Sequence, residues 1–261
     1  IGLAGRAVAD GDVPASMPTP PRDVAPTGAL RVAIAVGPAA STFWATRDPG
    51  SGAARGVTVE LAKAAAARLG VPLQLVLYQN SGEIAAAAVN DGWDISFMPA
   101  DAERGKVVDQ GPPYVVYEST FLVRAGSDIR TIADVDRDGI RVGAIAGTST
   151  SRTVAKSLKH ATLTTFEKPE AAAELLGRLE LDALAMGTDA LIDLAKGLPG
   201  TRVLKEPVQS TGVVVTVPKH RPAAREWAAR FIEQAKADGT VRHAFDSAGF
   251  AGTAVAPPTR K

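Results

Sequence analysis

Two short polar stretches in this chain have the residue types that bind a small anion. Residues 101–104 end in Arg104, whose planar guanidinium offers paired donors to a carboxylate. Thr148 directly precedes a predicted helix, so it can cap that helix while the following N–H groups, beginning at Ser149, point outward. Each stretch also has a purely structural explanation. Arg104 can pair with its acidic neighbours on a solvated loop, and Thr148 can be an ordinary helix cap.

The composition excludes several other chemistries. The 261 residues contain no cysteine and only three scattered histidines, so we expect no disulfide, no thiolate nucleophile and no metal centre. The 29 basic and 28 acidic residues leave a formal charge of +1, which gives no net field that would attract nucleic acid or an anionic membrane. No segment reaches the ~18 consecutive apolar residues that a transmembrane helix needs. We therefore expect a small-molecule ligand, with neither a cofactor nor a nucleic-acid partner.

Short β-branched segments alternate with Ala- and Leu-rich helical segments, which predicts βαβ units and mostly parallel sheets. The predicted strands cover residues 30–36, 72–78, 94–98, 115–124, 140–146, 162–166, 182–186 and 213–217. The predicted helices run from about 57 to 70, 81 to 89, 150 to 159, 169 to 178, 188 to 197 and 222 to 236. The Pro112-Pro113-Tyr114 sequence predicts a break before the strand at 115–124. No phosphate-binding glycine motif is present, so nucleotide binding is not supported.

These elements form two similar α/β halves, with the end of the chain returning to complete the first. We expect a flexible leader at 1–28, lobe I at 29–116 plus 210–250, lobe II at 117–209 and a flexible tail at 251–261. The small residues at 7–9 are a weak hint of a cleaved secretory segment.

The order of several sequence segments is similar to that of a known family. The segments are LRVAI, RGVTVELAKAAAARLGVPLQL, DGWDIS, ERGKVVDQGPPYV, IRVGAIAGTST, GRLELDALAMGTDALI and KADGTVRHAF. Together they resemble the family 3 extracellular solute-binding proteins, the periplasmic receptors of polar amino-acid ABC importers.

The resemblance implies an α/β, two-lobed periplasmic binding protein-like fold of type II. Each lobe would be a mixed sheet flanked by helices, joined to the other by two hinge strands near 116–119 and 207–212. It also implies a periplasmic, monomeric, non-enzymatic receptor that closes around a polar, carboxylate-bearing solute and delivers it to a membrane permease.

Binding residues follow from the same resemblance. Arg104 stands where the family grips the ligand α-carboxylate, and the turn at Thr148 and Ser149 would complete that pocket from lobe II. Phe43 or Trp44 would cover the ligand side chain, although a core position is equally compatible with an aromatic residue. If Arg104 faces an open, hydrated cleft, its replacement should harm binding far more than folding.

Two departures from the family pattern concern the ligand amine. The segment that begins at Ser96 continues as Phe97-Met98-Pro99, so hydroxyl and N–H contacts are lost. The acidic partner of the α-ammonium aligns with Gly187, and Asp189, two residues further on, is explained as a first-turn acid that favours the helix dipole. An unpaired ammonium would be costly to bury. The ligand is therefore an amino acid only if Asp189 replaces the missing acid, and otherwise an acid or heterocycle without an α-amine.

Other functions remain open on the same scaffold. The family resembles periplasmic cyclohexadienyl dehydratases, and a general acid for such an enzyme would have to be Glu103, Asp101 or Glu174. A sensory domain, or an accessory protein of a periplasmic dehydrogenase, is the third class. The fold alone does not decide among them.

Overall fold

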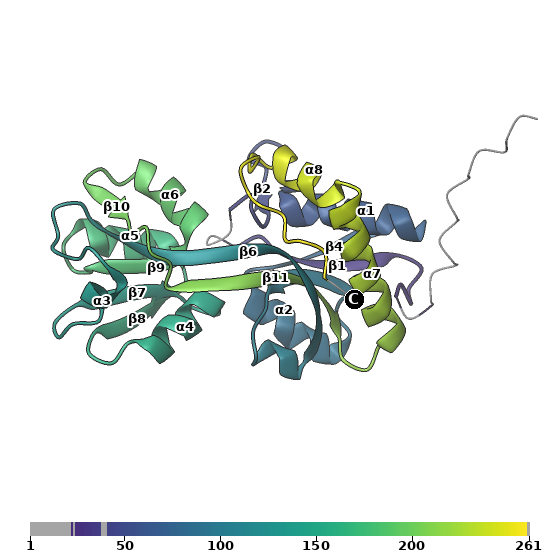
Figure 1. The fold of residues 1–261 in the computed structure, drawn as a ribbon, viewed down its shortest axis with the longest axis horizontal. Helices are drawn as coiled ribbons and strands as arrows, with labels where there is room; N and C mark the ends of the chain where they lie inside the picture. Colours follow the sequence, from purple (N-terminus) through teal and green to yellow (C-terminus); the bar gives the residue numbers. More distant parts are fainter. Residues whose placement is uncertain (1–21, 23, 38–40, 260–261) are drawn as a thin grey trace, which may run out of the picture.

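Two lobes of strands and helices are joined by two long strands in the computed structural model, which describes residues 22, 24–37 and 41–259. The connecting strands are β6 (Val108–Arg124) and β11 (Gln209–Pro218), which run side by side from one lobe to the other (Figure 1). The possible secretory segment at residues 7–9 lies outside the described residues. Within the described part, no helix is long and apolar enough to cross a membrane.

Lobe I is the part of the molecule that contains strands β1 to β5 and the helices that pack on them. Its strands are β1 (Leu30–Ala35), β2 (Thr46–Arg47), β3 (Ala54–Arg55), β4 (Leu73–Tyr78) and β5 (Ile95–Pro99). Its helices are α1 (Val57–Leu69), α2 (Ser81–Ala87), α7 (Pro222–Ala237) and α8 (Thr240–Ser247), with short 3₁₀ turns η1 (Ala88–Asn90) and η2 (Arg104–Lys106).

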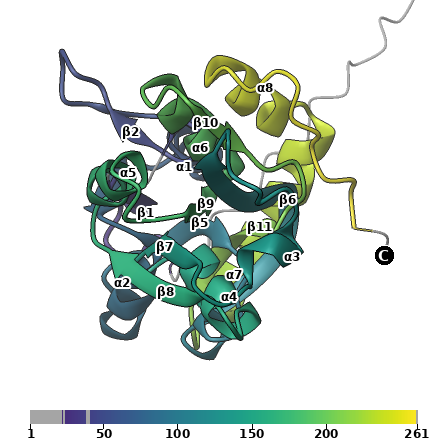
Figure 2. The ribbon, with the colours of Figure 1, turned by 90° about the vertical axis from the view of Figure 1, so that its left-hand side faces the viewer.

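Lobe II is formed by the part of the chain between β6 and β11. Its strands are β7 (Arg141–Ile145), β8 (Thr162–Phe166), β9 (Ala183–Gly187) and β10 (Thr201–Val203). Its helices are α3 (Ile132–Val135), α4 (Ser149–Ser157), α5 (Pro169–Gly177) and α6 (Thr188–Lys196). Seen along the length of the molecule, these helices surround the strands of the lobe (Figure 2).

Apart from β2 and β3, which pair only with each other, the strands of both lobes belong to one mixed, nine-stranded sheet in the order β4-β1-β5-β11-β6-β9-β7-β8, with β10 paired to β6. Parallel strands form the outer part in each lobe, β4-β1-β5 and β9-β7-β8, and the long strands are antiparallel to them. The expected mixed α/β architecture is confirmed. The carboxyl ends of β1, β5, β7 and β9 all point toward the space between the lobes, where the loops that follow them meet.

Alternation along the strands creates two cores in lobe II, one on each face of its sheet. Phe121, Val142 and Ala183 pack with Val154 of α4 on one face. Leu122, Leu184 and Leu176 of α5 pack on the other. Because strands covered on both faces need apolar residues at every position, they appear in the sequence as continuous apolar segments.

Strand β6 begins at Val108, seven residues before the predicted start, so the break predicted at Pro112-Pro113 is wrong. The prolines are accommodated because the β6–β11 pairing shifts register between Val213 and Thr216, opposite this part of β6. A proline removes one ladder hydrogen bond, and an irregularity of this kind is where a strand tolerates that loss.

Both predicted flexible ends contain residues that pack on lobe I. Val24, within the expected leader, is fully buried in the main core of that lobe. In the expected tail, Val255 pairs with Val115 and Ala256 donates a hydrogen bond to the carbonyl of Tyr114, 2.8 Å away. The expectation of a flexible tail from 251 is therefore wrong for residues 251–259, because an unpaired edge of β6 is available to this segment.

An arginine–aspartate arrangement is repeated at the start of each lobe. The backbone N–H of Arg31 and its Nη2 donate to the two carboxylate oxygens of Asp94, each at 2.8 Å. Arg141 bonds Asp182 in the same way, with its N–H at 2.9 Å and its Nη2 at 3.0 Å. In each lobe the aspartate directly precedes a central strand, so the ion pair ties together the amino ends of two parallel strands.

We predict that Asp94→Ala destabilises the protein by about 3 to 5 kcal/mol, because it removes the buried carboxylate to which the largely buried Arg31 is paired. The Asp94 side chain is fully buried, and Arg221 is its second partner at 3.2 Å. Asp182→Ala is the matched variant. Its loss should be about 1 to 2 kcal/mol, because the side chain of Arg141 is 45% exposed and can be solvated. Urea unfolding measures both, and equal losses would contradict the prediction.

Candidate functional site

A cavity of about 90 Å³, partly open to solvent, lies between the two lobes. One part of its wall is apolar and comes from both lobes. The apolar lining residues are Ala35, Trp44, Phe97, Pro99, Ile145, Ala185 and Met186. A wall of this composition accommodates the apolar body of a small molecule.

The rest of the wall is polar but uncharged. It consists of Thr58, Gln79, Asn80, Ser81, Tyr117, Thr148, Ser149 and Thr150, together with Gly187. Among the lining residues that the structure describes, none is an aspartate, glutamate, lysine, arginine or histidine. Any formal charge on a ligand is therefore met by dipoles and by charges set behind the wall.

The amino end of α4 supplies backbone N–H dipoles to the cavity wall. Gly147 has a φ of 72°, and an added Cβ would approach the Asn80 side chain to 2.8 Å, so glycine is required at this turn. Thr148 caps the helix by accepting the N–H of Ser151 at 3.1 Å. Ser149 and Thr150 line the cavity, and their N–H groups have no partner within the helix. A helix terminus of this kind favours a nearby anion.

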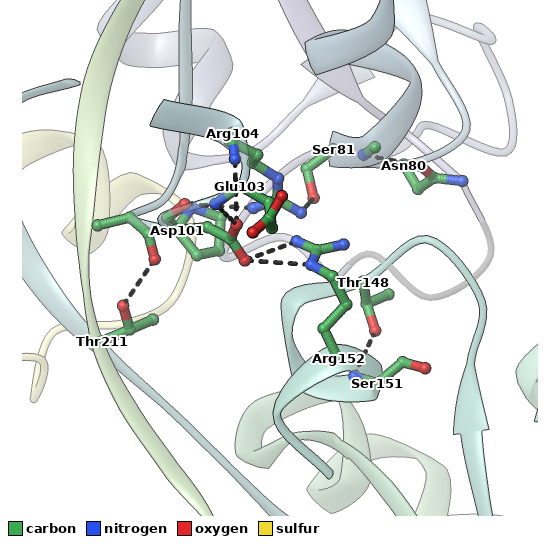
Figure 3. Close-up of polar contacts among 12 residues, drawn as sticks. Asn80, Ser81, Asp101, Glu103, Arg104, Thr148, Ser151, Arg152 and Thr211 are labelled. Carbon is green, nitrogen blue, oxygen red and sulfur yellow. Dashed lines mark hydrogen bonds and ion pairs between the residues drawn. The ribbon is translucent and has the colours of Figure 1, made fainter. Parts of the chain in front are cut away.

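Arg104 lies behind the cavity wall. Its Nη2 donates to Ser81 Oγ at 2.6 Å and its Nη1 to the carbonyl of Pro99 at 3.2 Å, and both of these residues line the cavity (Figure 3). The residue is only 4% exposed, so the open, hydrated setting considered for it is not what the structure shows. Burial, with repulsion from Arg152, lowers the pKa of Arg104 to about 10, which keeps it cationic at neutral pH.

Ser81 therefore transmits the charge of Arg104 to the cavity. Because its oxygen accepts from the guanidinium, its own proton is available to a ligand. The hydroxyl is held at this point by the start of α2, where Asn80 caps the helix and accepts the N–H groups of Gly82 and Glu83 at 2.9 and 3.0 Å. Nothing in the sequence reasoning singled out Ser81 or Asn80. A signal was present, because Asn80 follows a strand and is three residues before Glu83, as in a helix-capping pattern.

The other predicted site residues divide between the cavity and the core. Trp44 and Pro99 line the cavity, whereas Phe43 is buried against Tyr117 and Phe245, with ring centroids 4.7 and 5.4 Å away. Ser96 donates to the carbonyl of Ala33 at 2.9 Å and does not line the cavity. Met98 is packed in the core beneath α2. Successive side chains alternate along β5, which is why Phe97 and Pro99 face the cavity and the two neighbours do not.

Tyr117 fills the space beside Gly187. A Cβ built on Gly187 would stand 1.6 Å from the Tyr117 hydroxyl, so no side chain fits there while the tyrosine keeps its position. The hydroxyl donates to Asp189 Oδ1 at 2.7 Å, and the other oxygen of Asp189 accepts from Ser41 Oγ. Asp189 thus lies outside the lining and holds Tyr117. Burial, together with the negative charge of Asp189, raises the pKa of Tyr117 well above its usual range, so the phenol stays protonated.

Two polar contacts cross from one lobe to the other at the rims of the cavity. Arg152 of α4 donates to Asp101 Oδ2 of lobe I from Nη2 at 2.8 Å and from Nε at 3.2 Å (Figure 3). On the other rim, Ser41 of lobe I contacts Asp189 of lobe II. Burial opposes ionisation of Asp101, but its bonds to Arg152 and to the Arg104 N–H outweigh burial and lower its pKa.

Comparisons with known proteins agree with this arrangement. A search among curated proteins finds no significant match. Among solved structures, the ancestral amino acid-binding protein AncCDT-1, described as a precursor of cyclohexadienyl dehydratase, is 26% identical, with 84% of this chain and 94% of that chain covered at a TM-score of 0.72. A putative ABC transporter binding component from Wolinella succinogenes, complexed with lysine, is 23% identical, with 84% and 95% covered and a TM-score of 0.74.

A third similar structure is the amino acid ABC transporter substrate-binding protein AbpA from Streptococcus pneumoniae, bound to L-arginine. It is 22% identical, with 88% of this chain and 98% of that chain covered and a TM-score of 0.72. The family model for bacterial extracellular solute-binding proteins, family 3, matches residues 32–248, which include every element from β1 to α8 except the first two residues of β1. With its two lobes, its paired long strands and the cavity between them, the chain belongs to the bacterial extracellular solute-binding proteins of family 3.

Proposed function

We propose that this protein captures a small monocarboxylate without an α-ammonium group between its lobes, outside the cytoplasmic membrane, and delivers it to the permease of an ABC importer. The observation that carries the proposal is the distribution of charge around the cavity. The α4 amino end and Ser81, backed by Arg104, provide donors from both lobes. The remaining wall is uncharged, and an acid faces it nowhere among the described residues.

The same distribution disfavours a zwitterionic or cationic amino acid. The proteins of similar structure are described as bound to lysine or L-arginine. In this chain Gly187 stands where the family resemblance places the acid for the amine, and Tyr117 occupies the adjacent space. Asp189 is engaged by two hydroxyls. An ammonium in this cavity would lose water and would have to share the Asp189 carboxylate with the Ser41 and Tyr117 hydroxyls. Burying an ion without full compensation costs on the order of several kcal/mol.

The carboxylate end of the site couples binding to closure. Its donors come from opposite lobes, Ser81 from lobe I and the N–H groups of Ser149 and Thr150 from lobe II. One carboxylate reaches both sets only when the lobes are together. The Asp101–Arg152 and Ser41–Asp189 contacts form in the same arrangement and add to its stability. Movement about β6 and β11 then opens and closes the site.

The positions of the three acids considered for a dehydratase-like enzyme do not favour that alternative. Glu103 is exposed and pairs with Lys106 at 2.6 Å, and Glu174 is an exposed residue of α5 that pairs with Arg178. Asp101 is bound to Arg152, and its lowered pKa makes it a poor proton donor at neutral pH. None of the three lines the cavity. A general acid must reach the leaving group, so none of these three acids supports the dehydratase alternative.

The proposed ligand class is tested by a thermal-shift screen of the wild-type protein with apolar monocarboxylates and their primary amides. The probes are 3-phenylpropionate, 4-methylvalerate and nicotinate, with the standard amino acids as the comparison set. We expect at least one carboxylate to raise the melting temperature and its amide to do so much less, because a ligand that binds only the folded state stabilises it. Stabilisation by amino acids and by none of the carboxylates would overturn the proposal.

We predict that Ser81→Ala weakens binding of the carboxylate found in that screen by about tenfold and leaves its amide nearly unaffected, since one charge-backed hydrogen bond is lost. Calorimetry measures both ligands. Ser157→Ala, at the far end of α4, is the matched control, because its hydroxyl donates to the Val154 carbonyl and not to the cavity. Equal weakening of acid and amide would show that Ser81 does not carry the charge of Arg104 to the ligand.

We predict that Arg152→Gln increases the radius of gyration of the ligand-free protein, because it removes the ion pair that spans the lobes. Small-angle scattering measures the change. The wild-type protein should open in the same way as the pH falls below the ordinary Asp pKa of about 3.9, since a lowered folded pKa gives stability that is lost only on protonation. Lys196→Gln, which breaks a pair with Asp193 within α6, should leave the radius unchanged. Identical radii for Arg152→Gln and wild type would contradict the prediction.

A further inference from the structure

The backbones of the two lobes meet beside the cavity at a pair of glycines. Gly82 is the second residue of α2 in lobe I, and Gly147 directly precedes the Thr148 cap of α4 in lobe II. A Cβ built on Gly82 would stand 3.0 Å from the carbonyl oxygen of Gly147 and 3.5 Å from its Cα. The first of these contacts is tighter than side-chain carbons normally make, so a methyl group on Gly82 fits only if the Gly147 turn moves away.

The side chain of Asn80 in lobe I closes the space beside Gly147. A Cβ built on Gly147 would meet three atoms of the Asn80 amide, Oδ1 at 2.8 Å, Cγ at 2.9 Å and Nδ2 at 3.0 Å. Nearly equal distances to these atoms mean that the amide presents its face to the glycine. The amide is held in place, because its Oδ1 caps α2 by accepting the N–H groups of Gly82 and Glu83. Lobe I therefore fills the space that any side chain at position 147 would need.

The donors proposed for the carboxylate are the immediate neighbours of this glycine pair. Ser81 directly precedes Gly82, and Thr148 and Ser149 directly follow Gly147. All three neighbours line the cavity, and Figure 3 shows Ser81 at the start of α2 and Thr148 at the start of α4. Because so few bonds separate the donors from the glycines, the closest approach of the glycines fixes the distance between the two sets of donors.

We infer that Gly82 and Gly147 are the stop at which closure of the lobes ends, and that this stop sets the gap across which Ser81 and the amino end of α4 bind one carboxylate. The inference rests on the proposed function and deepens it, since it names the contact that fixes the width of the carboxylate site. Only glycine lets two backbones approach this closely. The peptide groups on both sides are held in helix starts, so the lobes return to the same gap whenever they close.

Gly82→Ala in the full chain tests the stop. The backbone of Gly82 is helical and outside the left-handed region, so alanine adopts it without strain. We expect the variant to bind the carboxylate found in the thermal-shift screen about tenfold more weakly, because the added methyl holds the lobes apart and the acid loses full contact with one set of donors. The primary amide of that acid should lose much less affinity. Calorimetry measures both ligands.

The distance between the lobes can be measured without any ligand. The chain contains no cysteine, so Lys63→Cys in α1 and Lys196→Cys in α6 place one spin label on an exposed position of each lobe. Double electron–electron resonance then reports the distribution of distances between the labels. Gly82→Ala should increase the share of long distances relative to the labelled wild type, because a contact that is too tight in the closed arrangement shifts the population toward the open one.

Two comparisons isolate the contact between the lobes. Gly177→Ala, at the last residue of α5, is the matched control, because a Cβ there would meet nothing within 4 Å, and it should leave binding and distances unchanged. A methyl group on Gly82 would also approach Asn80 Oδ1 to 2.9 Å within lobe I. Asn80→Ser keeps a good helix cap without that amide, and in this background Gly82→Ala should still weaken binding of the acid about tenfold.

The outcomes separate this inference from the proposed function. Affinity and interlobe distances like those of the wild type in Gly82→Ala overturn the stop. A loss of affinity that disappears in the Asn80→Ser background also overturns it, because the loss then comes from the helix cap of lobe I and not from Gly147. Equal weakening of acid and amide overturns the link to the carboxylate donors. If no carboxylate binds the wild-type protein, the proposed function is wrong, and the distances between the labels still decide whether the glycines limit closure.

Discussion

The antiparallel pairing of β6 with β11 is the interaction on which the rest of the structure depends. The ladder runs from Gln209–Ser119 in lobe II to Pro218–Val108 in lobe I, so the same two strands are central to the sheet in both lobes. Every residue that lines the cavity is placed relative to this pair, because the strands that end at the cavity pair with β6 or β11 or with their immediate neighbours. A flexible connection would let the lobes separate freely. A two-stranded ribbon instead keeps the two lobes in a fixed register.

Charge placement is the second organising feature. The aspartates and arginines near the cavity bond to one another, to hydroxyls or to a backbone carbonyl, and the buried Nε of Arg104 has no hydrogen-bond partner among the described residues. Asp101 is bound by Arg152, Asp189 by two hydroxyls, and Arg104 by Ser81 and Pro99. The lining itself then offers dipoles: the amino end of α4 and the hydroxyl of Ser81, whose oxygen accepts from Arg104. The interaction of a fixed dipole with a charge is stronger in a low-dielectric setting than in water, and a fixed dipole needs little reorganisation when a ligand enters.

The two lobes share two structural features, an arginine–aspartate pair and a helix amino end at the cleft. Each begins with an arginine that ties its first strand to the aspartate before the central strand, Arg31 with Asp94 and Arg141 with Asp182. Each presents a helix amino end to the cleft after a strand, at Asn80 in lobe I and at Thr148 in lobe II. The termini are thus a consequence of the βαβ unit. What distinguishes this cleft is which side chains stand beside them, above all Ser81 and Tyr117.

The sequence by itself determined the α/β class, the order of the main strands and helices and the Gly147-Thr148-Ser149 turn, because apolar segments, glycine and capping residues act locally. It also indicated that the acid expected at Gly187 is missing. Only the tertiary structure decided that Arg104 is buried behind Ser81, that Ser96 and Met98 point away from the cavity while Phe97 and Pro99 line it, and that Tyr117 occupies the space beside Gly187. These outcomes depend on strand alternation and on contacts between distant residues, such as Arg104 with Ser81, 23 positions apart, and Tyr117 with Asp189, 72 positions apart. The same holds for the chain ends, where Val24 and Val255 pack on lobe I because its core and strand edge are there to receive them, a fact that local composition does not contain.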